Sequence, residues 1–423
     1  MTQTVSQRAA HLIGSEIIKL AGEINDRIAA GEKIHNLTIG DFNPNVFPIP
    51  ELFRDEVMHA YMANQTNYPP ANGIKSLLDV VSQFIKVRQG LEYPASQYLI
   101  AGGGRPLIYA CYQALVDEGD KVLFPVPSWN NNHYTYLSGG ESIMIETTAE
   151  TNFMPTAAQL EPYISEVVLV ALCSPLNPTG TVFSREGLLE ICQLVIEENN
   201  KRKASGKRPV YMLFDQIYWQ LTFGGVEHVD PVSLVPEMRD YTIFVDGLSK
   251  SIAATGIRVG WAMGPKNVID KMKTILGHVG AWSPKPEQVA SARFLSNDEA
   301  LDEYMDDFKK KVFIRLEGLY EGFQALKNEG LPIDVIAPQA AIYLTARFPL
   351  KGFRAANGAV ISSTQDITAY LLNEAHVAVV PFYAFGASNE SDWYRVSVGT
   401  LTEAQISGVV ESIGRALRAL QPA

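Results

Sequence analysis

Five short apolar runs constrain the fold of this chain more than any other feature of its sequence. They are Lys121–Val126, Val167–Cys173, Val210–Phe214, Thr242–Val245 and Val259–Met263, and their hydrophobicity is continuous rather than alternating. Strands of this kind are typical of a parallel sheet that helices cover on both faces. Helical patterns such as Arg185–Lys201, with Ser184 as a plausible N-cap, and Pro106–Asp117 lie between the runs. The sequence therefore predicts a doubly wound α/β domain.

The pattern changes after residue 297. Asp302–Asn328 is rich in charged and aromatic residues at helical spacing, which predicts a long amphipathic connector. Beyond it, Ala340–Phe348 and Tyr394–Val398 alternate as strands do, and Ile367–Glu374 and Glu403–Leu420 have helical patterns. We therefore expect a large α/β domain at residues 51–297, followed by a smaller α+β region.

Composition excludes several classes of function. The 423 residues carry a net charge of −11, which argues against non-specific binding to nucleic acid. No uninterrupted apolar stretch reaches the ~18 residues of a membrane helix, and Met1–Ala10 lacks the apolar core of a signal peptide. Three cysteines without metal-like spacing suggest a reducing compartment. We expect a soluble cytoplasmic protein that has no metal site and no nucleic-acid or membrane partner.

Three charged residues follow the apolar runs in an arrangement that suits one cofactor. Lys250 ends Asp246-Gly247-Leu248-Ser249-Lys250, Arg258 follows it by eight residues, and Asp215 directly follows Val210–Phe214. A lysine at the end of a central strand is costly unless its pKa is lowered or it is used covalently. A lysine that can form a Schiff base, an arginine for a phosphate and an aspartate for a ring nitrogen are the parts needed to hold pyridoxal phosphate.

A glycine run provides the remainder of a phosphate site. Gly102-Gly103-Gly104-Arg105 follows the apolar stretch Tyr98–Ala101 and opens the predicted helix at Pro106. Glycines allow successive backbone N–H groups to turn towards one anion, and the helix N-terminus adds its dipole. We therefore expect Gly103, Gly104 and Arg105 to bind the phosphate, with the backbone amides of Gly104 and Arg105 as donors.

The order and spacing of these motifs resemble the fold type I aminotransferases of class I and II, which include the aspartate aminotransferases. The resemblance is carried by Asn177-Pro178-Thr179-Gly180, Asp215-Gln216-Ile217-Tyr218 and the Lys250–Arg258 segment, and it runs from about Ile13 to the C-terminus. It implies pyridoxal 5′-phosphate as cofactor and a mostly parallel large domain. It also implies that residues 1–50 pack with residues 298–423 as the small domain.

The resemblance assigns a role to each site residue. Lys250 would hold the cofactor covalently and act with Asp215 and Tyr218 in catalysis. Asn177 and Tyr218 would hydrogen-bond the phenolic oxygen of the cofactor, Trp129 would stack on its ring, and Ser249 and Arg258 would contact its phosphate. Arg395 would clamp the α-carboxylate of the substrate, and Asn177 would also contact the substrate. The backbone at Gly40 would close over the carboxylate. Tyr68 would reach the phosphate in a neighbouring subunit, which implies a homodimer with composite sites.

Three positions depart from the family pattern. Gln216 stands where the family has glutamate, and Gly247 stands where several relatives have a serine that donates to the phosphate. His133 lies four residues after Trp129, whereas aspartate-specific relatives have a histidine three residues after the tryptophan. Whether His133 reaches Asp215 is left open by the sequence.

The expected reaction is ping-pong transamination between an L-amino acid and a 2-oxo acid such as 2-oxoglutarate. C–S β-lyases and cyclopropane-carboxylate synthases use the same constellation and are the nearest alternatives. A regulatory domain fused to a DNA-binding module would need a basic extension before Ile13, and a nicotinamide-dependent dehydrogenase would need Gly-x-Gly-x-x-Gly; the sequence has neither.

The identity of the amino donor depends on a second cation. Aspartate and glutamate need one for the distal carboxylate, and the candidates are Lys285, Arg105 and, more weakly, His278. An apolar pocket for aromatic or neutral amino acids would instead be lined by Trp282, Phe42, Phe47, Phe382 and Tyr383. We expect aspartate or glutamate as the donor, with aromatic or neutral amino acids as the alternative.

Overall fold

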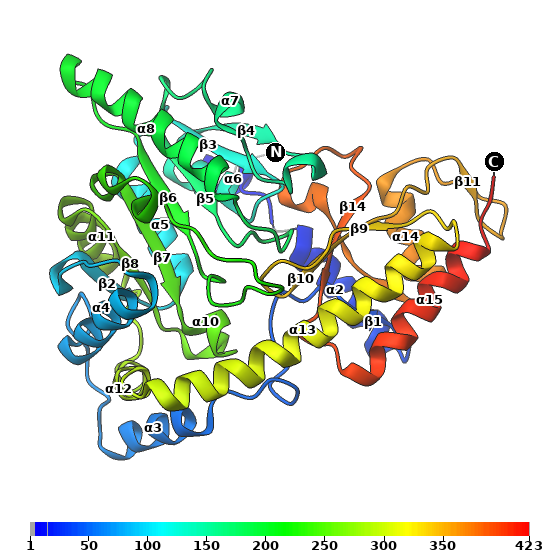
Figure 1. The fold of residues 1–423 in the computed structure, drawn as a ribbon, viewed down its shortest axis with the longest axis horizontal. Helices are drawn as coiled ribbons and strands as arrows, with labels where there is room; N and C mark the ends of the chain where they lie inside the picture. The colour runs from blue at the N-terminus through cyan, green and yellow to red at the C-terminus, as the bar shows by residue number, and fades with distance from the viewer. Residues whose placement is uncertain (1–4, 15, 423) are drawn as a thin grey trace.

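A seven-stranded sheet forms the centre of the protein in a computed structural model, which describes residues 5–14 and 16–422 (Figure 1). Its strand order is β2-β8-β7-β6-β5-β3-β4, and every neighbouring pair is parallel except those that include β8. The strands are β2 (Tyr98–Ala101), β3 (Lys121–Val126), β4 (Glu141–Glu146), β5 (Val167–Cys173), β6 (Tyr211–Asp215), β7 (Thr242–Gly247) and β8 (Gly260–Met263). The predicted α/β class with a mostly parallel sheet is confirmed.

Each predicted run became a strand. β3 and β5 have the predicted bounds, whereas β6 begins one residue later and includes Asp215 as its last residue. The sequence analysis did not find β4, because this edge strand is largely exposed and lacks a continuous apolar run. An edge strand needs to bury less surface than a central one, so its sequence signal is weaker.

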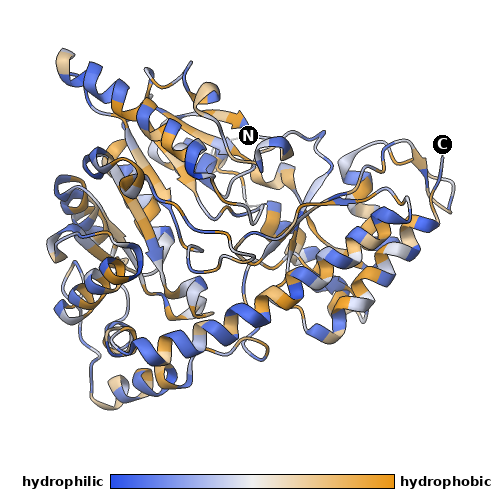
Figure 2. Ribbon diagram, viewed as in Figure 1, coloured by the Kyte–Doolittle hydropathy of each residue, from blue (hydrophilic) through white to orange (hydrophobic). Residues whose placement is uncertain are grey.

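Helices cover both faces of the sheet, as its apolar strands require. Residues that alternate along the strands, such as Val122 and Phe124, pack against α5 (Gly104–Leu115) and α11 (Lys266–Val279). The intervening residues, such as Leu123, belong to the larger core that includes α4 (Lys75–Gln89) and α8 (Arg185–Ser205). Figure 2 shows the contrast between the apolar strands and the outer helices, which carry both polar and apolar residues.

Two predicted helices differ from the structure at their ends. α5 begins at Gly104, two residues before the predicted Pro106, so the glycine run supplies the first turn of the helix. α8 continues to Ser205, and Ser184 caps it by accepting a hydrogen bond of 3.0 Å from Gly187 N. The remaining helices of the large region are α3 (Glu51–Met62), α6 (Asn131–Ser138), α7 (Ala157–Leu160), α9 (Pro231–Leu234), α10 (Leu248–Ser251) and α12 (Lys285–Leu295).

A long helix, α13 (Asp298–Asn328), leads from the large sheet to a second layer of structure (Figure 1). There β13 (Val380–Pro381), β14 (Trp393–Ser397), β10 (Tyr343–Arg347) and β9 (Asp334–Val335) form an antiparallel sheet in that order. The same region contains α14 (Thr364–Glu374), α15 (Ile406–Arg418) and the paired strands β11 (Phe353–Arg354) and β15 (Gln421–Pro422). These elements match the expected α+β region.

The N-terminal segment lies beside this C-terminal region. It contains α1 (Gln7–His11), α2 (Glu16–Ala29) and β1 (His35–Asn36), and β1 pairs in parallel with β12 (Val377–Ala378). Ile24 of α2 shares a small apolar cluster with Leu372 and Ala378. These contacts support our proposal that residues 1–50 and 298–423 form one small domain. Within residues 5–14 and 16–422, no helix combines the length and apolar character that crossing a membrane requires.

Candidate active site

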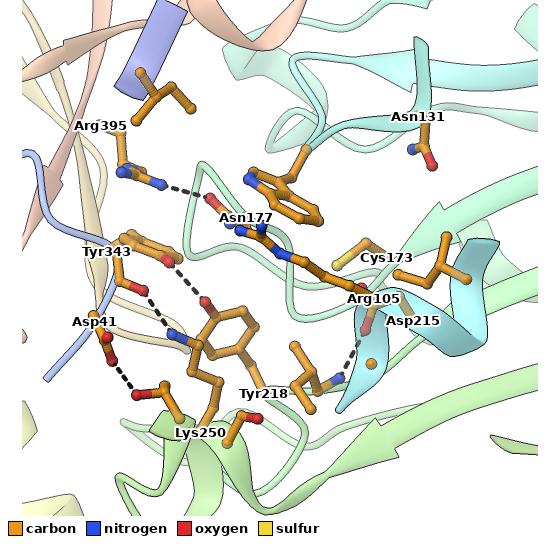
Figure 3. Close-up of a pocket in the computed structure, with 18 of the residues that line it drawn as sticks. Asp41, Arg105, Asn131, Cys173, Asn177, Asp215, Tyr218, Lys250, Tyr343 and Arg395 are labelled. Carbon is orange, nitrogen blue, oxygen red and sulfur yellow. Dashed lines mark hydrogen bonds between the residues drawn. The ribbon is translucent and has the colours of Figure 1, made fainter. Parts of the chain in front are cut away.

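A cavity of about 550 Å³ opens at the carboxyl ends of β5, β6 and β7 (Figure 3). Side chains or backbone from both parts of the chain line it, as expected for a ligand site at the strand ends of an open α/β sheet. The predicted site residues that line it are Gly40, Gly104, Arg105, Trp129, Asn177, Asp215, Tyr218, Ser249, Lys250, Arg258 and Arg395. Gly103 lies directly beside it, and Tyr68 lies outside it.

Lys250 enters the cavity from the short helix α10, which follows β7 without an intervening loop. Its Nζ donates a hydrogen bond of 2.6 Å to Gly40 O. Burial, together with the positive charges of the nearby arginines and against the opposing charge of Asp41, lowers the pKa of Lys250 to about 8. A much larger fraction of this amine is therefore uncharged near neutral pH than for a lysine in water.

Arg258 and the glycine run form one structural unit. Arg258 has a φ of +60°, and its guanidinium donates to Thr255 O and to Gly102 O, each at 2.7 Å. Gly103 has a φ of +93°, and a Cβ at this position would overlap the Arg258 guanidinium. Glycine at 103 thus lets the arginine lie against the first turn of α5. The backbone N–H groups at the start of this helix and the guanidinium together suit a phosphate.

Asp215 is the last residue of β6 and faces the cavity from its floor. Its Oδ1 accepts a hydrogen bond of 3.1 Å from Ile217 N, and burial raises its pKa to about 6. Within the described chain no hydrogen bond joins this carboxylate to His133, which lies half-buried on α6 and does not line the cavity. Asn131, two residues earlier on α6, lines the cavity instead and accepts a hydrogen bond of 3.0 Å from the Tyr112 hydroxyl.

Arg395 is 2% exposed and is held by the protein on two sides. Its Nη1 donates to Asn177 Oδ1 at 3.0 Å, and its Nη2 donates to Thr38 O at 2.6 Å. Burial lowers the pKa of Arg395. The guanidinium carbon lies 4.7 Å from the centre of the Tyr343 ring, so an aromatic face stabilises the buried charge.

Arg105 also points into the cavity, and Figure 3 shows its side chain extending towards Asn177. Its guanidinium carbon lies 4.6 Å from the centre of the Trp129 ring. Among the described residues Arg105 forms no salt bridge, so its charge is available to a ligand. The other candidates for a second cation, Lys285 and His278, do not line this cavity.

Lys285 instead donates a hydrogen bond of 2.6 Å to Asn67 Oδ1, at the first turn of α12. The aromatic residues considered for an apolar pocket are also absent from the cavity lining: Phe42, Phe47, Trp282, Phe382 and Tyr383. Trp282 packs edge-on against the exposed Tyr68, with ring centres 5.3 Å apart. The structure therefore places Arg105, and none of these alternatives, in the cavity of its own chain.

Several lining residues were missed by the sequence analysis. The Tyr343 and Tyr218 hydroxyl oxygens lie 2.6 Å apart and share a hydrogen bond. Asp41 Oδ1 accepts hydrogen bonds from Thr255 Oγ1 at 2.7 Å and from Phe42 N at 2.8 Å. Asp41 directly follows Gly40, so its position was a usable signal. Tyr343 lies in an apolar strand, where a tyrosine is normally part of the core.

Comparison with known proteins matches nearly the whole chain to one family. The sequence model described as "Aminotransferase class I and II" matches residues 32–413. An aspartate aminotransferase of Geobacillus stearothermophilus is 30% identical over 98% of this chain and 99% of its own length. One from Bacillus sp. strain YM-2 is 28% identical over 96% of this chain and 98% of its own.

Solved structures give the same result. The crystal structure of the aspartate aminotransferase from Rhizobium meliloti superposes with a TM-score of 0.89 at 26% identity, covering 99% of this chain and all of that one. The Thermus thermophilus aspartate aminotransferase with maleate superposes with a TM-score of 0.86 at 25% identity, covering 98% of this chain and all of that one. The predicted resemblance is confirmed.

Proposed function

The chain belongs to the class I and II aminotransferase family, and from this premise we propose that it uses pyridoxal 5′-phosphate to move an amino group from aspartate or glutamate to a 2-oxo acid such as 2-oxoglutarate. Members of the family depend on this cofactor and act on amino and oxo acids. The relatives named aspartate aminotransferases support a dicarboxylic donor.

The charge of the cavity is the observation that carries the proposal. It is lined by Arg105, Arg258, Arg395 and Lys250, against the two carboxylates of Asp41 and Asp215, in a protein whose net charge is −11. Such a concentration of cations would be strongly unfavourable without anionic ligands. The cofactor phosphate and the carboxylates of a dicarboxylic substrate are anions that would balance it.

The residues present fit the cofactor. Its phosphate would be held by the first turn of α5 and by side chains that meet there, and its ring would lie between Trp129 and the strand ends. The residues that would hold it are Tyr68 of a partner subunit together with Gly103, Gly104, Arg105, Trp129, Asn177, Asp215, Tyr218, Ser249, Lys250 and Arg258. When bound, pyridoxal phosphate supplies an electron sink for the bond that breaks at the substrate Cα.

Lys250 is the group that would move the proton at the substrate Cα. Its pKa of about 8 lies close to neutral pH, where a group can both accept and return a proton. Tyr218 and Tyr343 lie beside it with their hydroxyls hydrogen-bonded to each other, and its Nζ lies 5.8 Å from the Tyr218 ring centre. Asp215, half-buried at the end of β6 and negatively charged, would keep a proton on the ring nitrogen.

Arg395 and Arg105 would hold the two ends of a dicarboxylic substrate. Arg395 is already oriented by Asn177 and Thr38, and its fork suits the α-carboxylate beside Gly40. The backbone N–H of Arg105 would serve the cofactor phosphate, so its guanidinium, which has no acidic partner in the described chain, is left for a second carboxylate. We assign it to the distal carboxylate, in place of Lys285.

Assembly belongs to the same proposal. Tyr68 is 81% exposed and lies outside the cavity of its own chain, as a residue that serves a partner's site would. A homodimer with composite sites is therefore proposed. The cytoplasmic location stays a prediction.

A panel of amino donors tests the function. Purified protein is first checked for the near-ultraviolet absorbance of a bound pyridoxal group, and then aspartate, glutamate, phenylalanine, tyrosine and alanine are compared with 2-oxoglutarate as acceptor. We expect kcat/KM to be highest for the two dicarboxylic donors. Higher values for phenylalanine or tyrosine would contradict the assignment of Arg105, and release of pyruvate from cysteine conjugates without transamination would support a β-lyase instead.

A further inference from the structure

A partly buried polar cluster lies next to the active cavity, and the proposed mechanism makes no use of it. Its members are Gln89, Gln216, Trp219, His228 and Asp246, and none of them lines the active cavity. Gln216 is the residue at which this chain departs from the family motif, and it is fully buried. Polar groups in such surroundings are costly unless they are hydrogen-bonded, so their contacts identify what the cluster holds in place.

One hydrogen bond in this cluster joins two segments that carry the reactive groups. Trp219 Nε1 donates to Asp246 Oδ2 at 2.8 Å, and Asp246 Oδ1 accepts from Gly247 N at 2.7 Å. Trp219 directly follows Tyr218 and lies four residues after Asp215. Asp246 lies four residues before Lys250, near the end of the neighbouring strand β7. The Trp219–Asp246 bond therefore ties the Asp215–Tyr218 loop to the turn that presents Lys250.

The second part of the cluster supports the same loop. Gln216 Nε2 donates to Gln89 Oε1 at 2.9 Å, and Gln216 Oε1 lies 3.3 Å from His228 Nε2. Burial lowers the pKa of His228 to about 3, so the ring is neutral and its Nε2 can donate to the amide oxygen. A glutamate at 216 would place a negative charge beside the buried carboxyl of Asp246, whereas the amide of Gln216 does not.

We propose that Trp219 and Asp246 are positioning residues, whose hydrogen bond fixes the distance between Lys250 and the Asp215–Tyr218 loop. The inference rests on the proposed function, because it concerns groups that would act on the same bound cofactor. Displacement of a reacting group by about 1 Å can lower a rate by on the order of 100-fold. A hydrogen bond that holds the Asp215–Tyr218 loop against the turn that carries Lys250 should therefore affect kcat.

Asp246→Asn removes this bond with little change in charge. Burial raises the pKa of Asp246 to about 8, so its carboxyl is largely neutral at pH 7. Asparagine has one acceptor oxygen where the carboxyl has two, so either Trp219 or Gly247 loses its partner. Trp219→Phe keeps a smaller aromatic ring in place and removes the donor. Both variants break the same link from opposite ends.

We expect each variant to lower kcat by about 10- to 100-fold while the KM of the amino donor stays within about 2-fold. The substrate carboxylates are held by Arg395 and Arg105, which the cluster does not contact. The double variant should be no slower than Asp246→Asn alone, because without the indole N–H the asparagine oxygen is free to accept from Gly247 N.

The matched control is Trp261→Phe. Trp261 is 1% exposed, lies on β8 and packs against Phe84, which Trp219 also contacts, but its Nε1 has no hydrogen-bond partner in the described chain. This variant loses the same volume from the same core without breaking a hydrogen bond. We expect its kcat to stay within about 3-fold of wild type.

A second readout uses the protein without cofactor or substrate. The rate of acylation of Lys250 is followed against pH by peptide mass spectrometry, which reports the pKa of its amine. In Trp219→Phe and Asp246→Asn we expect the midpoint to move up from about 8 by half a unit or more, as Lys250 leaves its buried position; in Trp261→Phe it should not move.

Unchanged midpoints and kcat in both variants would overturn the proposal, as would losses that multiply in the double variant. Should Asp246→Asn fail to fold, Trp219→Phe carries the test alone, since Asp246 keeps its bond to Gly247. A wild-type protein that transaminates no donor would refute the proposed function, whereas the acylation midpoints would still decide whether the bond positions Lys250.

Discussion

Replacing Arg395 with lysine should weaken transamination of every donor by a similar factor. The guanidinium now makes two hydrogen bonds to protein acceptors, Asn177 Oδ1 and Thr38 O, and it would make two more to the α-carboxylate. A lysine keeps the charge but has one nitrogen atom, which cannot occupy both positions of the fork.

The magnitude follows from the burial of the site. A hydrogen bond that involves a charged group contributes about 1.5–3 kcal/mol, and at a side chain that is 2% exposed water cannot replace a lost one. With one to two such bonds lost, the transition state should lose about 2–4 kcal/mol of stabilisation. This corresponds to a fall in kcat/KM by a factor of roughly 30 to 1,000.

The assay compares kcat/KM of Arg395→Lys for aspartate, glutamate, phenylalanine and alanine, with Arg105→Gln as the matched variant. Because all four donors have the same α-carboxylate, the losses in Arg395→Lys should agree within about 3-fold. Arg105→Gln should affect only aspartate and glutamate. A loss in Arg395→Lys confined to the dicarboxylic donors would mean that the α-carboxylate has been assigned to the wrong arginine.

Four further predictions follow from the same site. Lys250→Ala should lose transamination by several orders of magnitude and retain cofactor only non-covalently, and borohydride reduction with peptide mapping of the wild type should label Lys250 and no other lysine. Asp215→Ala should retain some cofactor but lose most of its rate, whereas Asp215→Glu keeps more, as measured in single-turnover half-reactions. Tyr68→Ala should weaken cofactor binding, and light scattering of the wild type should show a dimer. A fully active wild-type monomer would contradict the proposed composite site. Folding raises the pKa of Asp246 from 3.8 to about 8, so the folded protein should become less stable as the pH rises through that window. Asp246→Asn has no carboxyl to titrate and should not show this loss. The Tm values of both cofactor-free proteins at pH 5 and pH 8 measure the difference.

The sequence predicted the sheet well because central parallel strands must be apolar on both faces. β3 and β5 have the predicted bounds, and the motifs that directly follow β5, β6 and β7 line the cavity as expected. A residue at the end of a strand, or within four positions after it, takes its location from the sheet. Asp215, Asn177 and Lys250 could therefore be assigned from sequence, since the strand ends meet at one edge.

Residues further from the strand ends were predicted less well. His133 lies in α6, and the cavity lining at this helix is Asn131. One residue along a helix turns a side chain by about 100°, so a spacing of four instead of three after Trp129 changes which side chain faces the site. The sequence showed the altered spacing but not its consequence, because the start of α6 relative to Trp129 is set by packing.

The choice between Arg105 and Lys285 shows why a specificity cation is harder to identify than a cofactor residue. Both are basic residues in the first turn of a helix, so the local sequence does not show which of them faces the substrate. They differ in what precedes them: α5 follows the sheet strand β2 and begins beside Arg258, whereas α12 begins far along the chain, where Lys285 meets Asn67. Charge alone marks a candidate, and within one chain a helix that begins at the cofactor's edge of the sheet brings its first side chains within reach of the cavity. Arg105 satisfies this condition through Gly103, since any larger residue there would displace Arg258 and the turn that carries Arg105.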